Sequence, residues 1–365
     1  MNILHLYDSK DILVARHVAL LQQNDTTNDV RTAAGGGYMP DIVHLHGCWH
    51  HGRARQAMQL QRRGARLVLT PHHQLQPWAT AHHRLDDKWP KMLLWQRRLC
   101  AGCYCMIASG QWELQVLRQL GWTPRIEHIA DAAITQELTA RDMARRMAAT
   151  YRKVMDSHPA ALLSAEAWHL LPCILKAGVS GDRRWVDMPA QQLNELGNAL
   201  SSEDWRHLYI YAFHSGLADI FSRGLDLLQL QSVPVDARRI PIYLPQPKKP
   251  ETKDVRPAEP QDAEPQYRQA TDITALLLDI RRATALGRLS FGLLADMVCL
   301  LRQPQLNEDK LMADLRRQRL AGCMAALLPL LAETMLLEEG FMPCAPTDNR
   351  LTSAMRRALQ HHLAI

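Results

Sequence analysis

Histidines gather at the ends of two short apolar runs in the first quarter of the chain. The runs cover residues 42–45 and 67–69, and the polar residues within or just after them include His44, His46, Thr70, His72 and His73. Imidazole titrates near neutral pH, so it can take up or release a proton and can also ligate a metal ion. The two clusters therefore predict a binding or catalytic site.

A metal site is one interpretation of these histidines. His44 and His46 alternate with Leu45, so both side chains point to the same face of a strand. With His72 they could form a three-imidazole site. Strand-end histidines that hydrogen-bond the backbone are the commoner case, and only Asp41 suggests a supporting carboxylate. We therefore expect no bound metal.

The two apolar runs predict strands, because they are too short for helices and rich in Val, Leu and Ile. Residues 53–63 between them have a helical pattern, so residues 41–78 predict a βαβ unit with parallel strands. Ligands of open α/β sheets bind beyond the carboxyl ends of the strands. His46, Gly47 and the segment Thr70–His73 would lie there, and His46 and His72 should share one crevice.

Strand and helix patterns alternate from residue 1 to about residue 130. Further strands are expected over 2–7, 106–109 and 125–129. The helix after the first strand should bury its apolar face, which carries Ile12, Ala15, Val18, Ala19 and Leu21. This alternation predicts an α/β fold with a Rossmann-like parallel sheet over residues 1–135.

The rest of the sequence predicts a mainly α-helical region. Residues 136–244 and 269–365 have helical periodicity, whereas residues 245–268 are rich in Pro and mixed charge and have few apolar residues. Such a composition is typical of a linker. The C-terminal helices should form a hairpin or small bundle, through which the chain could contact a protein partner.

Composition excludes several classes of protein. The net charge is +6 over 365 residues, but the basic and acidic residues are interspersed and aromatic residues make up only 6%, so we expect no nucleic-acid partner. The longest uncharged apolar stretch, residues 321–332, is shorter than the roughly 20 residues of a membrane span. The eight cysteines form no disulfide framework, and the first residues are too acidic for a signal peptide. These features predict a cytoplasmic protein.

Several motifs together resemble a known family. They are His44–Trp49 (HLHGCW), Thr70–Trp78 (TPHHQLQPW), Ile107–Ser109 (IAS) and Ile126–Ala132 (IEHIADA). Their order and spacing are similar to the N-terminal, acceptor-side domain of two-domain, GT-B type glycosyltransferases of family 4. The resemblance covers residues 1–135, about a third of the chain.

The resemblance implies a glycosyltransferase of polysaccharide biosynthesis. It would transfer a hexose from a nucleotide sugar, its donor substrate, to a glycan or related acceptor, without another cofactor. His72 occupies the position at which these enzymes often have a catalytic imidazole. Residues that would bind the substrate are His46, Gly47, Trp49, Thr70, His73 and Trp78.

The sequence also departs from the family pattern. The loop 7–10 after the first strand has no glycine, Ala130–Ala132 lacks the usual Asn-Gly pair, and the residues after 135 do not resemble the nucleotide-sugar domain. A second hypothesis is therefore a non-catalytic protein, derived from an acceptor domain, that binds a glycan or a partner. A metal-dependent hydrolase ranks third.

Overall fold

The computed structural model describes residues 1–33, 38–81, 91–243, 265–304 and 306–360. The chain forms two compact units, Met1–Met155 and Asp156–Ile365, called the N-terminal and the C-terminal unit below. The first is an α/β unit and the second is helical, as the sequence predicts.

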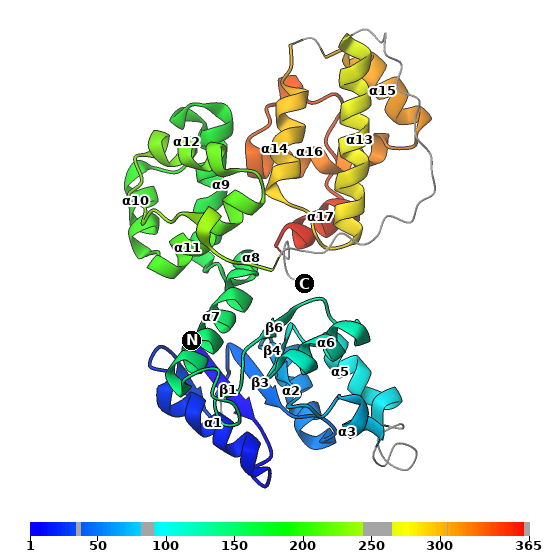
Figure 1. Cartoon of the computed structure of the whole chain (residues 1–365). Coiled ribbons are helices and arrows are strands. Elements are labelled where there is room, and N and C mark those ends of the chain that lie inside the picture. Colours follow the sequence, from blue (N-terminus) through cyan, green and yellow to red (C-terminus); the bar gives the residue numbers. More distant parts are fainter. Residues whose placement is uncertain (34–37, 82–90, 244–264, 305, 361–365) are drawn as a thin grey trace. The chain divides into compact units, whose positions relative to one another are not determined.

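The N-terminal unit is built on a parallel sheet of six strands in the order β2-β1-β3-β4-β5-β6 (Figure 1). The strands are β1 (Asn2–Leu6), β2 (Asp29–Arg31), β3 (Ile42–His46), β4 (Arg66–Thr70), β5 (Cys105–Ala108) and β6 (Ile126–His128). The helices are α1 (Ile12–Asn24), α2 (His51–Arg62), α3 (Pro77–Ala81), the π-helix η2 (Met92–Gln96), α5 (Arg97–Gly102), α6 (Gln111–Leu120) and α7 (Ala140–Asp156). The expected neighbours β3, β4 and β5 are adjacent in the sheet.

The two faces of this sheet differ in chemistry, because successive side chains of a strand point to opposite faces. One face carries the leucines and valines of the core, among them Leu4, Val43 and Leu67. The opposite face carries His44 and, in register with it on β1, His5. The sheet therefore buries the two imidazole rings of His5 and His44 side by side on one face.

Helix α1 packs on this polar face with a side that matches the sequence pattern at Val18 and Leu21 but differs from it at Ile12 and Ala19. Ile12 is 80% exposed and Ala19 is exposed, whereas Val14, His17, Val18 and Leu21 are buried. Asp11 caps the helix by accepting a hydrogen bond from the backbone N–H of Val14. This orientation of the helix places His17 in the interior.

Helix α7 belongs to the N-terminal unit, which extends past the boundary expected at residue 135. Tyr151 of this helix hydrogen-bonds His44 of β3 across a buried contact. Helix α7 therefore packs, through Tyr151, against the sheet face that carries His5 and His44.

The described part of the C-terminal unit consists of helices without strands. The α-helices that begin and end within it are α8 (Pro159–Leu162), α9 (Ala165–Ser180), α10 (Ala190–Ala199), α11 (Ser202–His214), α12 (Ala218–Leu228), α13 (Pro265–Ala285), α14 (Phe291–Leu301), α15 (Glu308–Arg317), α16 (Ala321–Met335) and α17 (Arg350–Gln360). Three 3-10 turns, η3 (Arg183–Trp185), η4 (Ala237–Arg239) and η5 (Glu339–Phe341), complete the unit. Of the expected linker 245–268, residues 245–264 lie outside the described residues and 265–268 open α13. Across the described chain, no helix is long and apolar enough to cross a membrane.

Helices α9 and α12 pack through a reciprocal pair of glycines. A Cβ atom at Gly178 would lie 2.0 Å from the carbonyl oxygen of Ile220, and one at Gly224 would lie 2.0 Å from that of Ile174. Each glycine thus lets the backbone of the other helix approach. A side chain at either position would force the helices apart.

We predict that Gly178→Ala destabilises the C-terminal unit, because the added methyl group meets backbone that cannot move aside alone. Overpacking of this kind costs about 1–3 kcal/mol. The matched control is Gly322→Ala in α16, where nothing lies within 4 Å of the new Cβ and alanine favours the helix. Urea unfolding should show a lower free energy of unfolding for the first variant alone. Equal effects of the two substitutions would contradict this packing.

Candidate functional site

The candidate site lies at the carboxyl ends of β1, β3 and β4. The sheet order places β1 between β2 and β3, so the chain changes direction of winding at the β1–β3 boundary. Open parallel sheets bind ligands at such a switch point. His46 ends β3 and Thr70 ends β4, and the two residues are paired in register.

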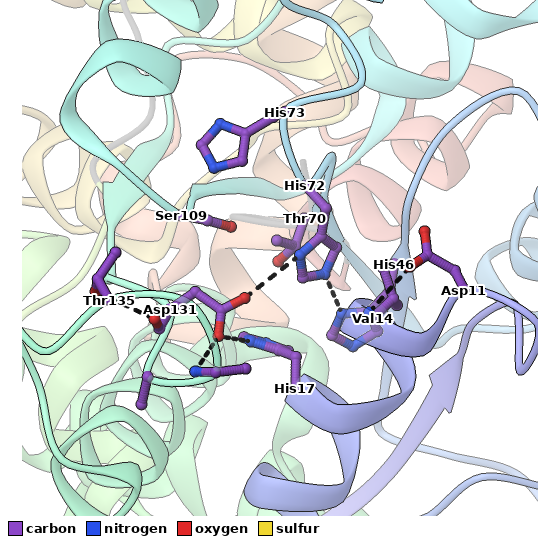
Figure 2. Close-up of polar contacts among 12 residues, drawn as sticks. Asp11, Val14, His17, His46, Thr70, His72, His73, Ser109, Asp131 and Thr135 are labelled. Atoms are coloured by element: carbon purple, nitrogen blue, oxygen red, sulfur yellow. Dashed lines mark hydrogen bonds and ion pairs between the residues drawn. The ribbon is translucent and has the colours of Figure 1, made fainter.

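Five histidines form what we call the imidazole cluster: His5, His17, His44, His46 and His72. The first four are buried, and the side chain of His72 is 6% exposed. His46 is at the centre of the cluster. Its Nε2 lies 2.7 Å from Nδ1 of His5. Its Nδ1 lies 3.0 Å from Nε2 of His72, a contact that Figure 2 shows. The structure thus brings the rings of His46 and His72 into direct contact.

His44 is held by two hydroxyl groups on the sheet side of the cluster. Its Nδ1 lies 2.6 Å from the hydroxyl of Tyr151, and its Nε2 lies 2.7 Å from Oγ1 of Thr70. Both ring nitrogens are therefore satisfied within the protein. Thr70, expected to bind substrate, uses its hydroxyl for this internal contact.

Asp131 provides the negative charge beside the cluster. Its Oδ1 lies 2.9 Å from Nδ1 of His17, and its Oδ2 lies 3.9 Å from Nδ1 of His72 (Figure 2). Burial alone would raise the pKa of Asp131. The contact with His17 and the backbone N–H of Ala133 outweigh that effect and hold this pKa below its ordinary value.

Burial makes these imidazoles weak bases. Burial, with the neighbouring His17 as the second cause, lowers the pKa of His5 and of His72 from 6.5 to about 3. The same desolvation, with the nearby histidines, lowers the pKa of His44 and of His46 well below the ordinary value. These four rings are neutral at pH 7. A neutral ring has one N–H and one lone pair, which suits ring-to-ring hydrogen bonds.

The backbone is strained at the ends of β3 and β4. Trp49, His72 and His73 have φ angles of 68°, 49° and 63°, in the left-handed region that side chains disfavour. Gly47 has φ 80° and donates its N–H to the carbonyl of Thr70 at 2.8 Å. Strained residues cluster at functional sites because the surrounding structure must hold them there.

Glu113 of α6 fixes the loop after β4. Its carboxylate accepts the backbone N–H of His73 at 2.6 Å and that of Ser109 at 2.7 Å. Burial raises the pKa of Glu113, although these two hydrogen bonds act in the opposite direction. The side chain of His73 is 31% exposed, and its Nδ1 lies 2.9 Å from the amide nitrogen of Gln76.

A cavity of about 210 Å³ opens at the end of β3. Its lining residues are Asp8, Asp11, Val14, His46, Gly47, Cys48, Trp49, His50, Arg53 and Gln74. The indole N–H of Trp49 donates to the carbonyl of Gln74 at 3.2 Å. His46 therefore connects this cavity with His72. Trp78 is 62% exposed and is not among the lining residues.

Sequence reasoning missed His5, His17, Tyr151 and Asp131 as members of the site. His5 had a signal, since it occupies the same alternating position on β1 as His44 does on β3. His17 and Tyr151 lie on helices, and which side of a helix faces the sheet depends on packing. Asp131 follows the last strand, where a carboxyl-end residue would be expected near the site.

We predict that acid destabilises the N-terminal unit between pH 6.5 and pH 3. In this window the unfolded chain binds protons at His5 and His72 that the folded chain does not, so the free energy of unfolding falls as the pH is lowered. The loss should amount to several kcal/mol. Urea unfolding followed by tryptophan fluorescence at several pH values measures it.

A non-titrating variant tests the cause of this pH dependence. His5→Gln should reduce its slope, whereas His169→Ala, at an exposed position of α9, should not change it. Stability that is constant from pH 7 to pH 4, or an unchanged slope in His5→Gln, would refute the assignment of neutral buried imidazoles.

Comparison with known proteins adds a family to this geometry. Residues 32–132 match the family model of Glycosyltransferase Family 4. The matched residues are between a quarter and a third of the chain. No curated protein and no solved structure matches. The match spans β3 to β6 and includes His46, Gly47, Thr70, His72 and Asp131. The protein is therefore glycosyltransferase-like, and its α/β unit resembles the N-terminal domain of family 4 enzymes.

Proposed function

We propose that the protein transfers a hexose from a nucleotide sugar to a glycan or related acceptor, as enzymes of polysaccharide biosynthesis do. The observation that supports this best is His72, a strained residue at the end of β4 within the family match. It contacts His46, which lines the cavity at the switch point. The N-terminal unit would bind the acceptor.

His72 would serve as the catalytic imidazole. Glycosyl transfer needs a group that takes the proton of the acceptor hydroxyl or stabilises the charge that develops. A neutral His72 has a lone pair available at pH 7. Asp131 beside its Nδ1 would stabilise the imidazolium that forms, and it raises the pKa of His72 against the larger effect of burial. The contact between His46 Nδ1 and His72 Nε2 would open so that the acceptor hydroxyl reaches the lone pair of His72.

The other expected substrate residues take different parts in this proposal. Gly47 lets a ligand approach the backbone, and Trp49 offers an aromatic wall to a sugar ring. Trp78 is exposed and free to stack on a longer glycan. His73 would contact the acceptor with its partly exposed ring, while Thr70 acts indirectly by holding His44.

One observation favours the second candidate, a non-catalytic protein that binds a glycan or a partner. Within the described residues, the C-terminal unit has no parallel sheet that could hold a nucleotide sugar. A donor-binding half could then come from a protein partner bound through the C-terminal helices.

The proposed compartment is the cytoplasm. The eight free cysteines support it, because disulfides are rare in reducing compartments.

We predict that substituting His72 abolishes hexose transfer. His72→Asn is the suitable variant, because asparagine tolerates a positive φ better than alanine does. Loss of a group that assists proton transfer costs about 10²–10⁴-fold in rate, with a smaller effect on binding. The assay incubates the full chain with a panel of nucleotide hexoses and glycan acceptors and follows nucleotide release.

The control for this assay is His169→Ala, which should keep the rate of the unmodified chain. Glycan binding that is equal in the unmodified chain and in His72→Asn, without any binding or turnover of a nucleotide sugar, would reject the enzyme in favour of the second candidate.

A further inference from the structure

Nε2 of His17 and Oδ2 of Asp131, both beside His72, are among the buried polar atoms that have no hydrogen-bond partner in the described residues. Nδ1 of His17 is another, and its 2.9 Å contact with Oδ1 of Asp131 is an ion pair. Both side chains are nearly inaccessible, with 2% of each exposed. Buried polar atoms without a partner are rare in native proteins and call for a missing water, ion or ligand.

His17, His46 and His72 have the geometry of a three-nitrogen site. Each can offer one ring nitrogen such that the three nitrogens lie within 4.8 Å of one another. They come from α1, from the end of β3 and from the loop after β4, so three separate parts of the fold converge there (Figure 2).

The surrounding contacts indicate which nitrogen each ring would offer. Asp131 faces Nδ1 of His17 and Nδ1 of His72, which leaves the Nε2 atom of both rings. His5 occupies Nε2 of His46, which leaves Nδ1. Metal-bound histidines usually donate the other ring N–H to a carboxylate or similar partner, which fixes the ring orientation.

We propose that His17, His46 and His72 bind a divalent transition-metal ion of the zinc class through His17 Nε2, His46 Nδ1 and His72 Nε2. Three imidazoles and one open position are typical of zinc sites that also bind water or a substrate. Bonds of 2.0–2.1 Å to a tetrahedral ion require nitrogens about 3.3 Å apart. His46 Nδ1 and His72 Nε2 lie 3.0 Å apart, so this pair would need to open only slightly.

The charges around the site favour this ion. Neutral imidazoles present lone pairs without first losing a proton. The carboxylate of Asp131 offsets part of the positive charge. A second group, His5, His44 and His46, is less suitable because Tyr151 and Thr70 occupy both nitrogens of His44.

This inference goes beyond the proposed glycosyl transfer. An ion on Nε2 of His72 would occupy the lone pair that takes the acceptor proton, so the loaded form would not catalyse transfer. Metal binding is measured without any sugar, and its outcome is therefore independent of whether the protein is a transferase.

The experiment titrates the full chain, freed of metal with a chelator, with Co²⁺ and with Zn²⁺. We expect one ion per chain, the visible absorption bands of tetrahedral Co²⁺, and displacement of Co²⁺ by Zn²⁺. X-ray absorption of the zinc form should show three imidazoles at about 2.0 Å. Absence of binding, an octahedral spectrum or fewer imidazoles would overturn the proposal and leave a water molecule as the partner of His17.

Three variants locate the ion. His17→Gln should abolish the tetrahedral bands, since the amide can still contact Asp131 but ligates zinc poorly. Asp131→Asn should weaken binding about 10–100-fold, as loss of an orienting partner does. His51→Ala, an exposed histidine of α2, should bind as the unmodified chain does. Unchanged binding by a folded His17→Gln would refute the site. If this variant does not fold, the number of imidazoles that X-ray absorption finds around the zinc is the test, and fewer than three would refute the site.

Discussion

The N-terminal unit depends on one constraint: imidazole nitrogens buried on a face of a parallel sheet must find partners away from water. An unpaired polar atom in such a place costs about 1–3 kcal/mol. The strand register places His5 beside His44, so the rings can contact each other across β1 and β3. Helices α1 and α7 then contribute His17 and Tyr151 to the same face.

This constraint also shapes the chemistry of the site. Burial that keeps the rings neutral makes each of them a weak base, and only Asp131 acts in the opposite direction on His72. The strained backbone at Trp49, His72 and His73 holds the polar groups beyond the carboxyl ends of the strands. A ligand in the cavity beside His46 would therefore meet Trp49 at the carboxyl end of β3.

The sequence predicted the sheet and the meeting of His46 with His72, because buried parallel strands have a clear apolar pattern and their carboxyl ends share one edge. The edge strand β2 (Asp29–Arg31) lies in a polar segment without such a pattern. The predicted buried face of α1 was wrong at Ile12 and Ala19, because a prediction from hydrophobicity places these residues in the core before His17. A histidine becomes a core residue only when partners such as Asp131 satisfy it, and no local pattern reveals those partners.

Two features of the imidazole cluster are central: the rings of His5, His44, His46 and His72 are neutral at pH 7, and ring-to-ring hydrogen bonds join His5, His46 and His72. Nitrogen-15 NMR of histidine-labelled chain tests this directly, because the ring shifts distinguish the two neutral tautomers from imidazolium. We expect neutral shifts for these four rings from pH 8 to pH 5, with a scalar coupling between His46 Nδ1 and His72 Nε2. Imidazolium shifts that develop near pH 6.5 for His46 and His72, without that coupling, would contradict the account.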